Sequence, residues 1–361
     1  MTFMYVNMFG KLLLVFFLIV TSCGKKKENT VVETVAPDGV QLQPQPFGTN
    51  LSGAEFGANV PGQHQQDYSY PLVTDLDYFK SKNMMLVRLP FKWERVQPVL
   101  YGPLDPVELK RLTDFIDAAA VRDILIIPDV HNFARRVVNG NREIIGTSLV
   151  PTTAFTDFWG KLAEVLKTKK NIWAYGVMNE PFNMPSNIAW FSIAQATINK
   201  IREIDQKTAI LVGGDSYSSA ERWPQVSENL KTLRDDTDNL IFEAHVYFDD
   251  TSAGTYDGTY DQEKATPQTG VNRLRPFVEW LKTNKKRGFI GEYGIPDDDP
   301  RWLVVLDNML KYMKENNING TYWSAGPRWG TYRLAIQPRN GIDRPQMQIL
   351  QNYQTTSPTQ K

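Results

Sequence analysis

The chain has 361 residues, 42% of them hydrophobic, which is enough to bury the core of one large domain or two ordinary ones. Forty Lys and Arg balance forty Asp and Glu, and this zero net charge removes the electrostatic basis for non-specific binding to nucleic acid. A single cysteine excludes an intramolecular disulfide and a metal cluster made of cysteines. The 9 Trp, 15 Tyr and 18 Phe supply flat apolar faces that suit sugar rings or bases, and the charge balance favours sugars.

Residues 1–22 have the pattern of a secretory signal. Lys11 precedes an apolar run at 12–20 that is too short to span a bilayer as a helix, and Cys23 follows small polar residues directly after it. This arrangement resembles the lipobox of bacterial lipoproteins, in which the cysteine is lipidated and becomes the mature N-terminus. We therefore expect a lipid anchor at Cys23 in a bacterial outer membrane, on its periplasmic or cell-surface side, and a flexible tether over 23–46. An ordinary signal peptide with an incidental cysteine is the alternative.

From residue 47 onward, short apolar runs alternate with longer segments of helical period, as in an α/β fold with parallel strands. Strands are predicted at 50–57, 84–90, 124–130, 172–178, 209–213, 240–246, 288–292 and 320–323. Helices are predicted at 106–121, 154–167, 187–204, 271–282 and 301–315. Eight strands predict one (β/α)8 TIM barrel over residues 47–352, with 353–361 as a disordered tail. Such a barrel carries its functional residues at the C-terminal ends of its strands.

Those strand ends are unusually polar, and they carry Arg88, His131, Asn132, Asn179, Glu180, His245, Tyr247, Glu292 and Trp323. Barrel strands are buried on both faces, so Glu180 and Glu292 at the ends of apolar strands are costly unless they have partners. The fourth and seventh strands face each other across the barrel mouth, where the two carboxylates can converge. A pair of carboxylates is what cleavage of a glycosidic bond requires.

Several motifs together resemble glycoside hydrolase family 5, a family of retaining barrel glycosidases, over about residues 47–350. They are Val177-Met178-Asn179-Glu180-Pro181, Gly291-Glu292-Tyr293-Gly294, Asp129-Val130-His131-Asn132, His245-Val246-Tyr247 and the stretch around Arg88. The segments 91–98 and 323–330 most resemble endo-acting β-1,4-glucanases, or cellulases. The resemblance implies Glu180 as acid/base and Glu292 as nucleophile. It also implies supporting roles for Arg88, His131, Asn132, Asn179, His245, Tyr247 and Trp323.

The physical roles can be stated for each group. Glu180 must be protonated in the first step and ionised in the second, so the anion of Glu292 should raise its pKa. Arg88 and Tyr247 are best placed to keep Glu292 ionised. Trp93, Trp223 and Trp329 follow strands in the chain and are expected to line outer sugar subsites. No cofactor and no metal is expected, because no second histidine stands at ligand spacing, and the chain is expected to act as a monomer.

Three functions remain open at this stage. The first is a retaining endo-β-1,4-glucanase acting on a cellulose-like polysaccharide or oligosaccharide. The second keeps the mechanism but acts on another β-linked backbone, such as a mannan, a xyloglucan, a mixed-linkage glucan or a xanthan-type glucan. The long inserts 135–150 and 248–270 would decide between these two, because loops set the sugar specificity of a barrel. The third is a non-catalytic lipoprotein that captures glycans.

Overall fold

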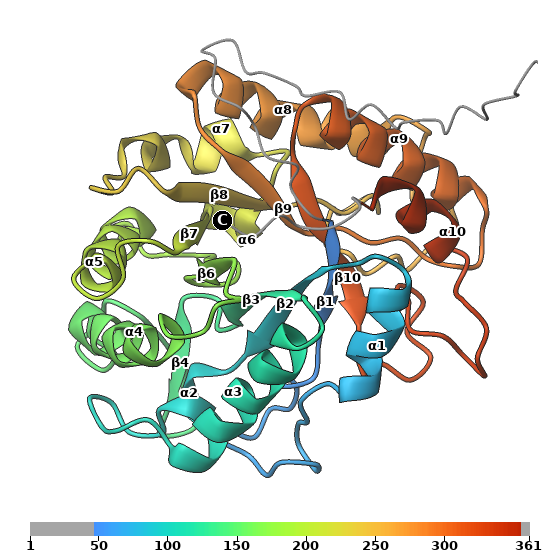
Figure 1. The fold of residues 1–361 in the computed structure, drawn as a ribbon. Helices are drawn as coiled ribbons and strands as arrows, with labels where there is room; N and C mark the ends of the chain where they lie inside the picture. Colours follow the sequence, from blue (N-terminus) through green and yellow to red (C-terminus); the bar gives the residue numbers. More distant parts are fainter. Residues whose placement is uncertain (1–46, 355–361) are drawn as a thin grey trace, which may run out of the picture. The chain divides into compact units, whose positions relative to one another are not determined.

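Eight parallel strands close into a barrel (Figure 1). Neighbours are hydrogen-bonded in the order β1, β2, β3, β6, β7, β8, β9 and β10, and β10 pairs again with β1. The strands are β1 (Gly48–Leu51), β2 (Leu86–Phe91), β3 (Leu125–Val130), β6 (Ala174–Gly176), β7 (Ala209–Gly213), β8 (Leu240–His245), β9 (Gly288–Glu292) and β10 (Asn319–Ala325). The predicted (β/α)8 barrel is therefore confirmed. This computed structural model describes residues 47–354, so the predicted signal, the tether and Cys23 lie outside the described residues.

The longer helices surround the barrel on its outside (Figure 1), and short ones lie in the loops between elements. They are α1 (Val73–Ser81), α2 (Trp93–Val96), α3 (Pro106–Ala120), α4 (Thr152–Leu166), α5 (Trp190–Arg202), α6 (Asp215–Ser218), α7 (Trp223–Val226), α8 (Thr269–Asn284), α9 (Arg301–Glu315) and α10 (Met347–Leu350). Helix α3 shows how the sequence starts such an element. The Asp105 side chain accepts hydrogen bonds from the backbone N–H groups of Val107 and Glu108, and Pro106 takes the first position, where no N–H is needed.

The barrel interior has an apolar layer with a charged layer above it. The apolar layer consists of Leu86, Leu125, Ile127, Ala174, Ala209, Leu211, Ile241 and Phe289. Residues two apart in a strand share a face, so Arg88 and Glu243 continue the interior face of Leu86 and Ile241. Both charged side chains are buried, at 0% and 1% exposure. The apolar layer therefore forms a dry floor beneath a set of charges.

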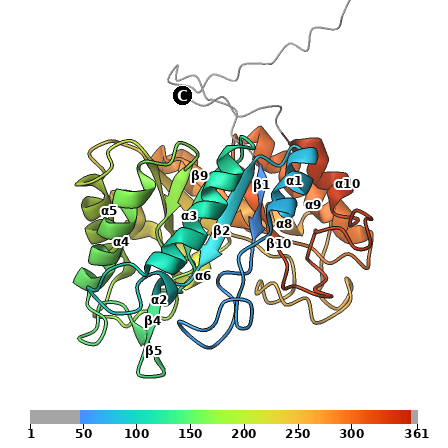
Figure 2. The same ribbon diagram turned by 60° about the horizontal axis from the view of Figure 1, so that its bottom comes forward.

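Three features of the fold differ from the prediction. Strand β1 ends at Leu51 rather than at 57, because Gly53 (φ 145°) turns the backbone out of the strand. The insert 135–150 contains a hairpin of β4 (Arg135–Val138) and β5 (Asn141–Ile144), which stands clear of the barrel in Figure 2. Helix α1 was not predicted, since its apolar pattern is weak.

The C-terminal boundary of the barrel domain also needs a small correction. Tyr353 was assigned to the tail, but it lies in a short 3-10 helix (Gln351–Tyr353). Its hydroxyl hydrogen is shared between the Asp307 carboxylate (2.7 Å) and backbone carbonyl (3.0 Å) on α9. The rest of the predicted tail, 355–361, lies outside the described residues.

Candidate active site

Arg88 is the centre of the charged layer. Its guanidinium lies 2.8 Å from the Glu243 carboxylate, 3.0 Å from that of Glu292 and 3.1 Å from that of Asp129. All four side chains are at most 5% exposed. A buried carboxylate is stable as an anion only beside a positive charge, so one arginine holds carboxylates from β3, β8 and β9 in a single cluster.

Two amides complete the surroundings of Arg88. Its Nη1 donates to Asn50 Oδ1 at 3.0 Å, and its Nη2 donates to Asn179 Oδ1 at 2.7 Å. Asn50 in turn donates to the Gly291 backbone carbonyl beside Glu292. The planar guanidinium thereby fixes the positions of side chains from β1, β9 and the segment after β6.

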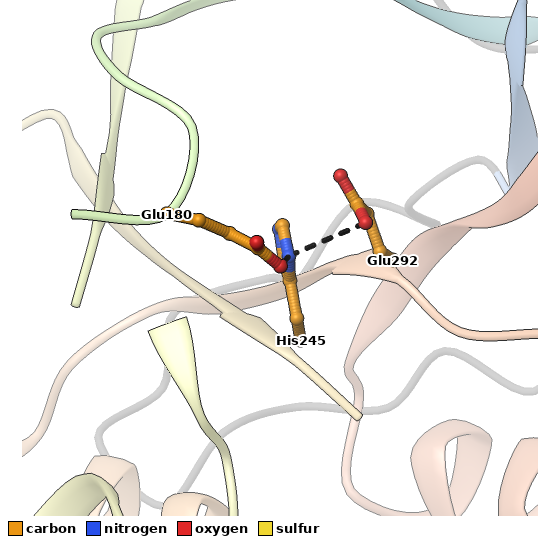
Figure 3. A group of neighbouring side chains, drawn as sticks. All are labelled: Glu180, His245 and Glu292. Carbon is orange, nitrogen blue, oxygen red and sulfur yellow. Dashed lines mark hydrogen bonds and ion pairs between the residues drawn. The ribbon is translucent and has the colours of Figure 1, made fainter. Parts of the chain in front are cut away.

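Glu180 and Glu292 point toward each other with the His245 ring between them (Figure 3). His245 Nδ1 lies 2.6 Å from Glu180 Oε1 and 3.6 Å from Glu292 Oε2. One oxygen or nitrogen of each residue lies within 4.8 Å of the others. The sequence prediction that the two carboxylates meet over the barrel is therefore met in the structure. Their proximity suits a retaining glycosidase, in which about 5–5.5 Å separates the pair.

The two glutamates have different electrostatic surroundings. Burial raises the pKa of Glu180, and the charge of Glu292 raises it further, while the hydrogen bond from His245 lowers it. Glu292 accepts hydrogen bonds on both oxygens, from Arg88 on Oε1 and from the Tyr247 hydroxyl (2.8 Å) on Oε2. Burial and the charge of Glu292 therefore make Glu180 easier to protonate, while Arg88 and Tyr247 both donate hydrogen bonds to Glu292.

His245 is a cation at neutral pH. Burial opposes its charge, but Glu292, Glu180 and Glu243 overcome this and raise the pKa of His245 to about 10. A protonated ring offers no lone pair to a metal ion, and the nearby Arg88 repels a further cation. The trio Glu180, His245 and Glu292 thus disfavours a metal ion, and the absence of a metal from the reaction stays a prediction.

His131 has the opposite character. Burial lowers its pKa well below the usual value, and Arg88 and Lys92 lower it further. Asn179 accepts from Arg88 through its oxygen, so its Nδ2 is the donor to His131 Nε2 at 3.3 Å. The His131 proton therefore sits on Nδ1, which donates to Asp129 Oδ2 at 2.8 Å. This chain fixes the orientation of the Asn179 amide beside Glu180.

The predicted aromatic residues divide into two groups. Trp323, at 9% exposure, stacks on His131 at 5.5 Å and so adjoins the charged cluster, and Trp329 meets Trp323 edge to face at 5.7 Å. Trp93 and Trp223 are wrong as outer subsites. Both are fully buried: Trp93 packs against Phe155 and Phe158, and Trp223 against Phe242, Phe277 and Trp280.

Asn132 also differs from expectation. Its oxygen accepts from the Trp93 backbone N–H at 2.8 Å, and its amide nitrogen donates to Glu94 and to the Arg135 backbone carbonyl. The side chain is therefore committed to holding α2 and the hairpin in place. Asn132 supports the scaffold and has no polar atom left for a sugar.

Sequence reasoning missed Asn50, Glu243, Phe182 and Tyr217. Glu243 had a detectable signal, because it is a lone carboxylate in an otherwise apolar strand, as Glu180 and Glu292 are. Tyr217 borders a cavity of about 500 Å³ beside Glu180, which His245, Tyr247 and Arg273 also line. A larger hollow of about 950 Å³ lies between α5 and residues 232–237, where Arg202 and Asp235 already pair with each other.

Comparison with known proteins identifies the family. Residues 47–328 match the family described as Cellulase (glycosyl hydrolase family 5). Endo-beta-1,4-glucanase B of Aspergillus niger is 34% identical over 85% of this chain and 89% of that protein. The endoglucanase Cel5A of Pseudomonas stutzeri, solved in complex with cellobiose, has a TM-score of 0.81 and 40% identity over 88% of this chain and 94% of that one. XacCel5A, solved in complex with cellopentaose, has a TM-score of 0.78 and 39% identity over 85% and 98% of the two chains. The chain therefore belongs to the cellulase family, glycosyl hydrolase family 5.

Proposed function

We propose that the protein is a retaining endo-β-1,4-glucanase that uses Glu180 as acid/base and Glu292 as nucleophile. One observation carries the proposal: two carboxylates at the barrel mouth lie within 4.8 Å of each other, one with a raised pKa and the other held by hydrogen bonds from Arg88 and Tyr247. This difference is what double displacement at an anomeric carbon requires.

In the first step Glu292 attacks the anomeric carbon while Glu180 gives its proton to the leaving oxygen. The attack forms a glycosyl ester and consumes the negative charge of Glu292. The charge of Glu292 is one of the causes that raise the pKa of Glu180, so this pKa falls once the ester exists. Glu180 then acts as the base that takes a proton from water, and the water oxygen attacks the same carbon and releases Glu292.

The surrounding groups position the sugar at the cleaved bond. Trp323 offers an aromatic face beside His131, on which the apolar side of a glucose ring can rest. Asn179 is held by Arg88 and His131 with its amide beside Glu180, where it can donate to the 2-hydroxyl group. Such a contact strengthens as positive charge develops on the ring in the transition state. Tyr247 keeps Glu292 aligned through its hydroxyl.

The choice of substrate rests on the relatives. Two similar proteins are named endoglucanases, one of which was solved with cellobiose bound, and the similar XacCel5A was solved with cellopentaose bound. We therefore assign internal β-1,4-glucosidic bonds to this site, in preference to mannan.

Hydrolysis of a panel of neutral soluble polysaccharides tests this assignment. We expect the purified enzyme to release reducing ends from hydroxyethyl cellulose and mixed-linkage β-glucan, with several oligosaccharide lengths among the early products. Release from mannan should be much slower. Exclusive formation of glucose or of one disaccharide from chain ends would contradict endo action, and preference for mannan would move the enzyme to the second candidate substrate.

We also propose the lipid anchor at Cys23, which rests on the sequence around that residue. Within residues 47–354 no helix is long and apolar enough to cross a membrane. In a bacterial host, wild-type protein should require detergent for extraction, and Cys23→Ser should move it to the aqueous fraction with unchanged activity per molecule. Identical fractionation of the two proteins would remove the anchor.

A further inference from the structure

Three aromatic side chains continue the site outward from Glu180, and we call them the aromatic wall: Phe133, Phe182 and Tyr217. Phe182 stacks on Tyr217 with ring centroids 4.3 Å apart and planes 13° apart. Phe133 meets Phe182 edge to face at 6.2 Å and His131 at 5.2 Å. The wall is therefore continuous with the charged cluster, and Tyr217 remains 47% exposed at its outer end.

The backbone under Tyr217 is held in an unfavourable conformation. Ser216, Tyr217 and Ser218 have φ values of 54°, 63° and 54°, in the left-handed region that side chains with a Cβ rarely adopt. The Tyr217 N–H donates to the Pro181 carbonyl at 3.1 Å, which ties this segment to the loop that begins at Glu180. A run of strained residues that exposes a large aromatic ring beside a reactive carboxylate indicates a surface used by a ligand.

Cationic side chains cover the same wall from the hairpin side. The Arg135 guanidinium lies 3.8 Å from the centroid of the Phe182 ring, and that of Arg142 lies 5.5 Å from Phe133. Burial lowers the pKa of Arg135, and the charge of Arg142 lowers it further. Two like charges are thus held close together, an arrangement that costs energy until an anion joins them.

Lys92 and Arg222 extend this positive rim. Lys92 Nζ lies 5.6 Å from the Phe133 ring, and Arg222 Nη1 donates to Ser216 Oγ at 2.9 Å, next to Tyr217. Among the described residues 47–354, neither these two nor Arg135 and Arg142 form an ion pair. The rim therefore consists of four cationic side chains around the wall, none of which has an ion-pair partner in that part of the chain.

Several nearby carboxylates have partners outside the rim, although the charges of Glu94 and Glu55 favour the protonated form of Lys92. In the hairpin, Arg136 faces Glu143 across the two strands, whereas Arg142 faces Val137 and shares the other face with Arg135. Glu221, beside Arg222 in the chain, lies 3.6 Å from Arg273 and accepts from Ser252 Oγ. Glu94 accepts from Asn132 and from the Val137 backbone. Lys92 Nζ donates inward to the His131 carbonyl at 3.0 Å, so the exposed Arg142 and Arg222 carry the positive charge at the open side of the wall.

We propose that the wall and its cationic rim bind a carboxylate substituent carried by the β-glucan chain, so that acidic glucans are preferred over neutral ones. The proposal rests on the proposed function and names the substrate class of that same site. The exposed Tyr217 ring provides a face for the sugar ring, and guanidinium groups provide the planar donors that match a carboxylate. An uncharged substituent of similar size would not be attracted electrostatically by the cationic rim.

The test compares two celluloses of equal degree of substitution, carboxymethyl cellulose and neutral hydroxyethyl cellulose. We expect wild type to have the higher kcat/KM on the acidic polymer at low ionic strength. Arg142→Gln and Arg222→Gln should each lower the ratio of the two kcat/KM values about three- to fivefold, as expected for one exposed charge contact. Both side chains are exposed, so the folded structure is kept. About 1 M NaCl, with a Debye length of about 3 Å, should bring the wild-type ratio down to that of the variants.

Arg275→Gln on α8 is the matched control, because it removes the same charge from an exposed position away from the rim. It should leave the ratio at the wild-type value. The proposed role of the rim would be contradicted if wild type, Arg142→Gln and Arg222→Gln had equal ratios. If hydroxyethyl cellulose were still cleaved in that case, the proposed function would remain supported. Failure of wild type to cleave either cellulose would overturn the proposed function and this inference with it.

Discussion

Glu292→Gly is expected to lower kcat on β-glucan more than about 10⁴-fold, because the covalent step loses its nucleophile. Azide can occupy the vacated space and attack an activated aryl β-glucoside on the face opposite the leaving group. The expected product is an α-glucosyl azide.

Glu180→Ala should lower hydrolysis of the polymer about 10²- to 10⁴-fold but spare the first step on the aryl glucoside, whose leaving group needs no proton. Azide then enters from the side of residue 180 and gives a β-glucosyl azide.

The stereochemistry separates the two roles in a way that loss of rate alone does not. Exchanged products would reverse the assignment of Glu180 and Glu292, and near-normal hydrolysis by either variant would remove that residue from catalysis. Glu279→Ala is the control, since Glu279 is an exposed carboxylate on α8. It should keep the wild-type rate and give no azide product. The anomeric configuration can be assigned by proton NMR of the isolated azides.

Arg88→Met should lower both stability and activity. It leaves Asp129, Glu243 and Glu292 buried without their cation, and breaking a buried pair in this way costs about 3–5 kcal/mol of unfolding free energy. Burial raises the pKa of Glu243, but Arg88 and His245 together outweigh this effect and the pKa is lowered. The stabilisation that the ionised Glu243–Arg88 pair gives to the fold is therefore present above the unfolded pKa of about 4.5 and is lost as the pH falls below that value. The deficit of the variant should therefore be large at pH 7 and smaller at pH 4, as measured by denaturant unfolding.

Arg202→Met is the matched control for Arg88→Met. Arg202 is a buried arginine that pairs with Asp235 through two contacts of 2.7 and 3.0 Å, away from the charged cluster. Its replacement should also destabilise the fold, but the molecules that remain folded should keep wild-type kcat. Arg88→Met should lose kcat per folded molecule as well. Normal turnover by folded Arg88→Met would show that Arg88 serves the scaffold only.

The fold and the central pair could be predicted because both depend on local patterns. The β7 and β9 segments are short apolar runs, and their predicted bounds match the structure. Glu292 interrupts such a run with a charge, and the barrel topology then brings the strand ends together. The hairpin was not predicted, although Asn139-Gly140 is a strong signal for a two-residue turn and both residues have positive φ.

The remaining features depend on side-chain direction, which sequence spacing does not reveal. Trp93 and Trp223 follow strands as a subsite tryptophan would, yet each lies in a four-residue helix, α2 or α7, that turns the ring into the core. Asn132 stands beside His131, but the backbone directs its amide toward α2. Tyr217 is exposed by left-handed backbone at three consecutive ordinary residues, for which no sequence pattern exists.

The closed ring of strands has a consequence for the nascent chain. Arg88 emerges early in synthesis, but Glu292 follows 204 residues later, and β1 has no second neighbour until β10 is made. An incomplete chain therefore exposes an open sheet edge and an unneutralised internal charge, both of which favour aggregation. Truncated or stalled chains that end before β10 should be substrates for chaperones and proteases and should hydrolyse no glucan at all.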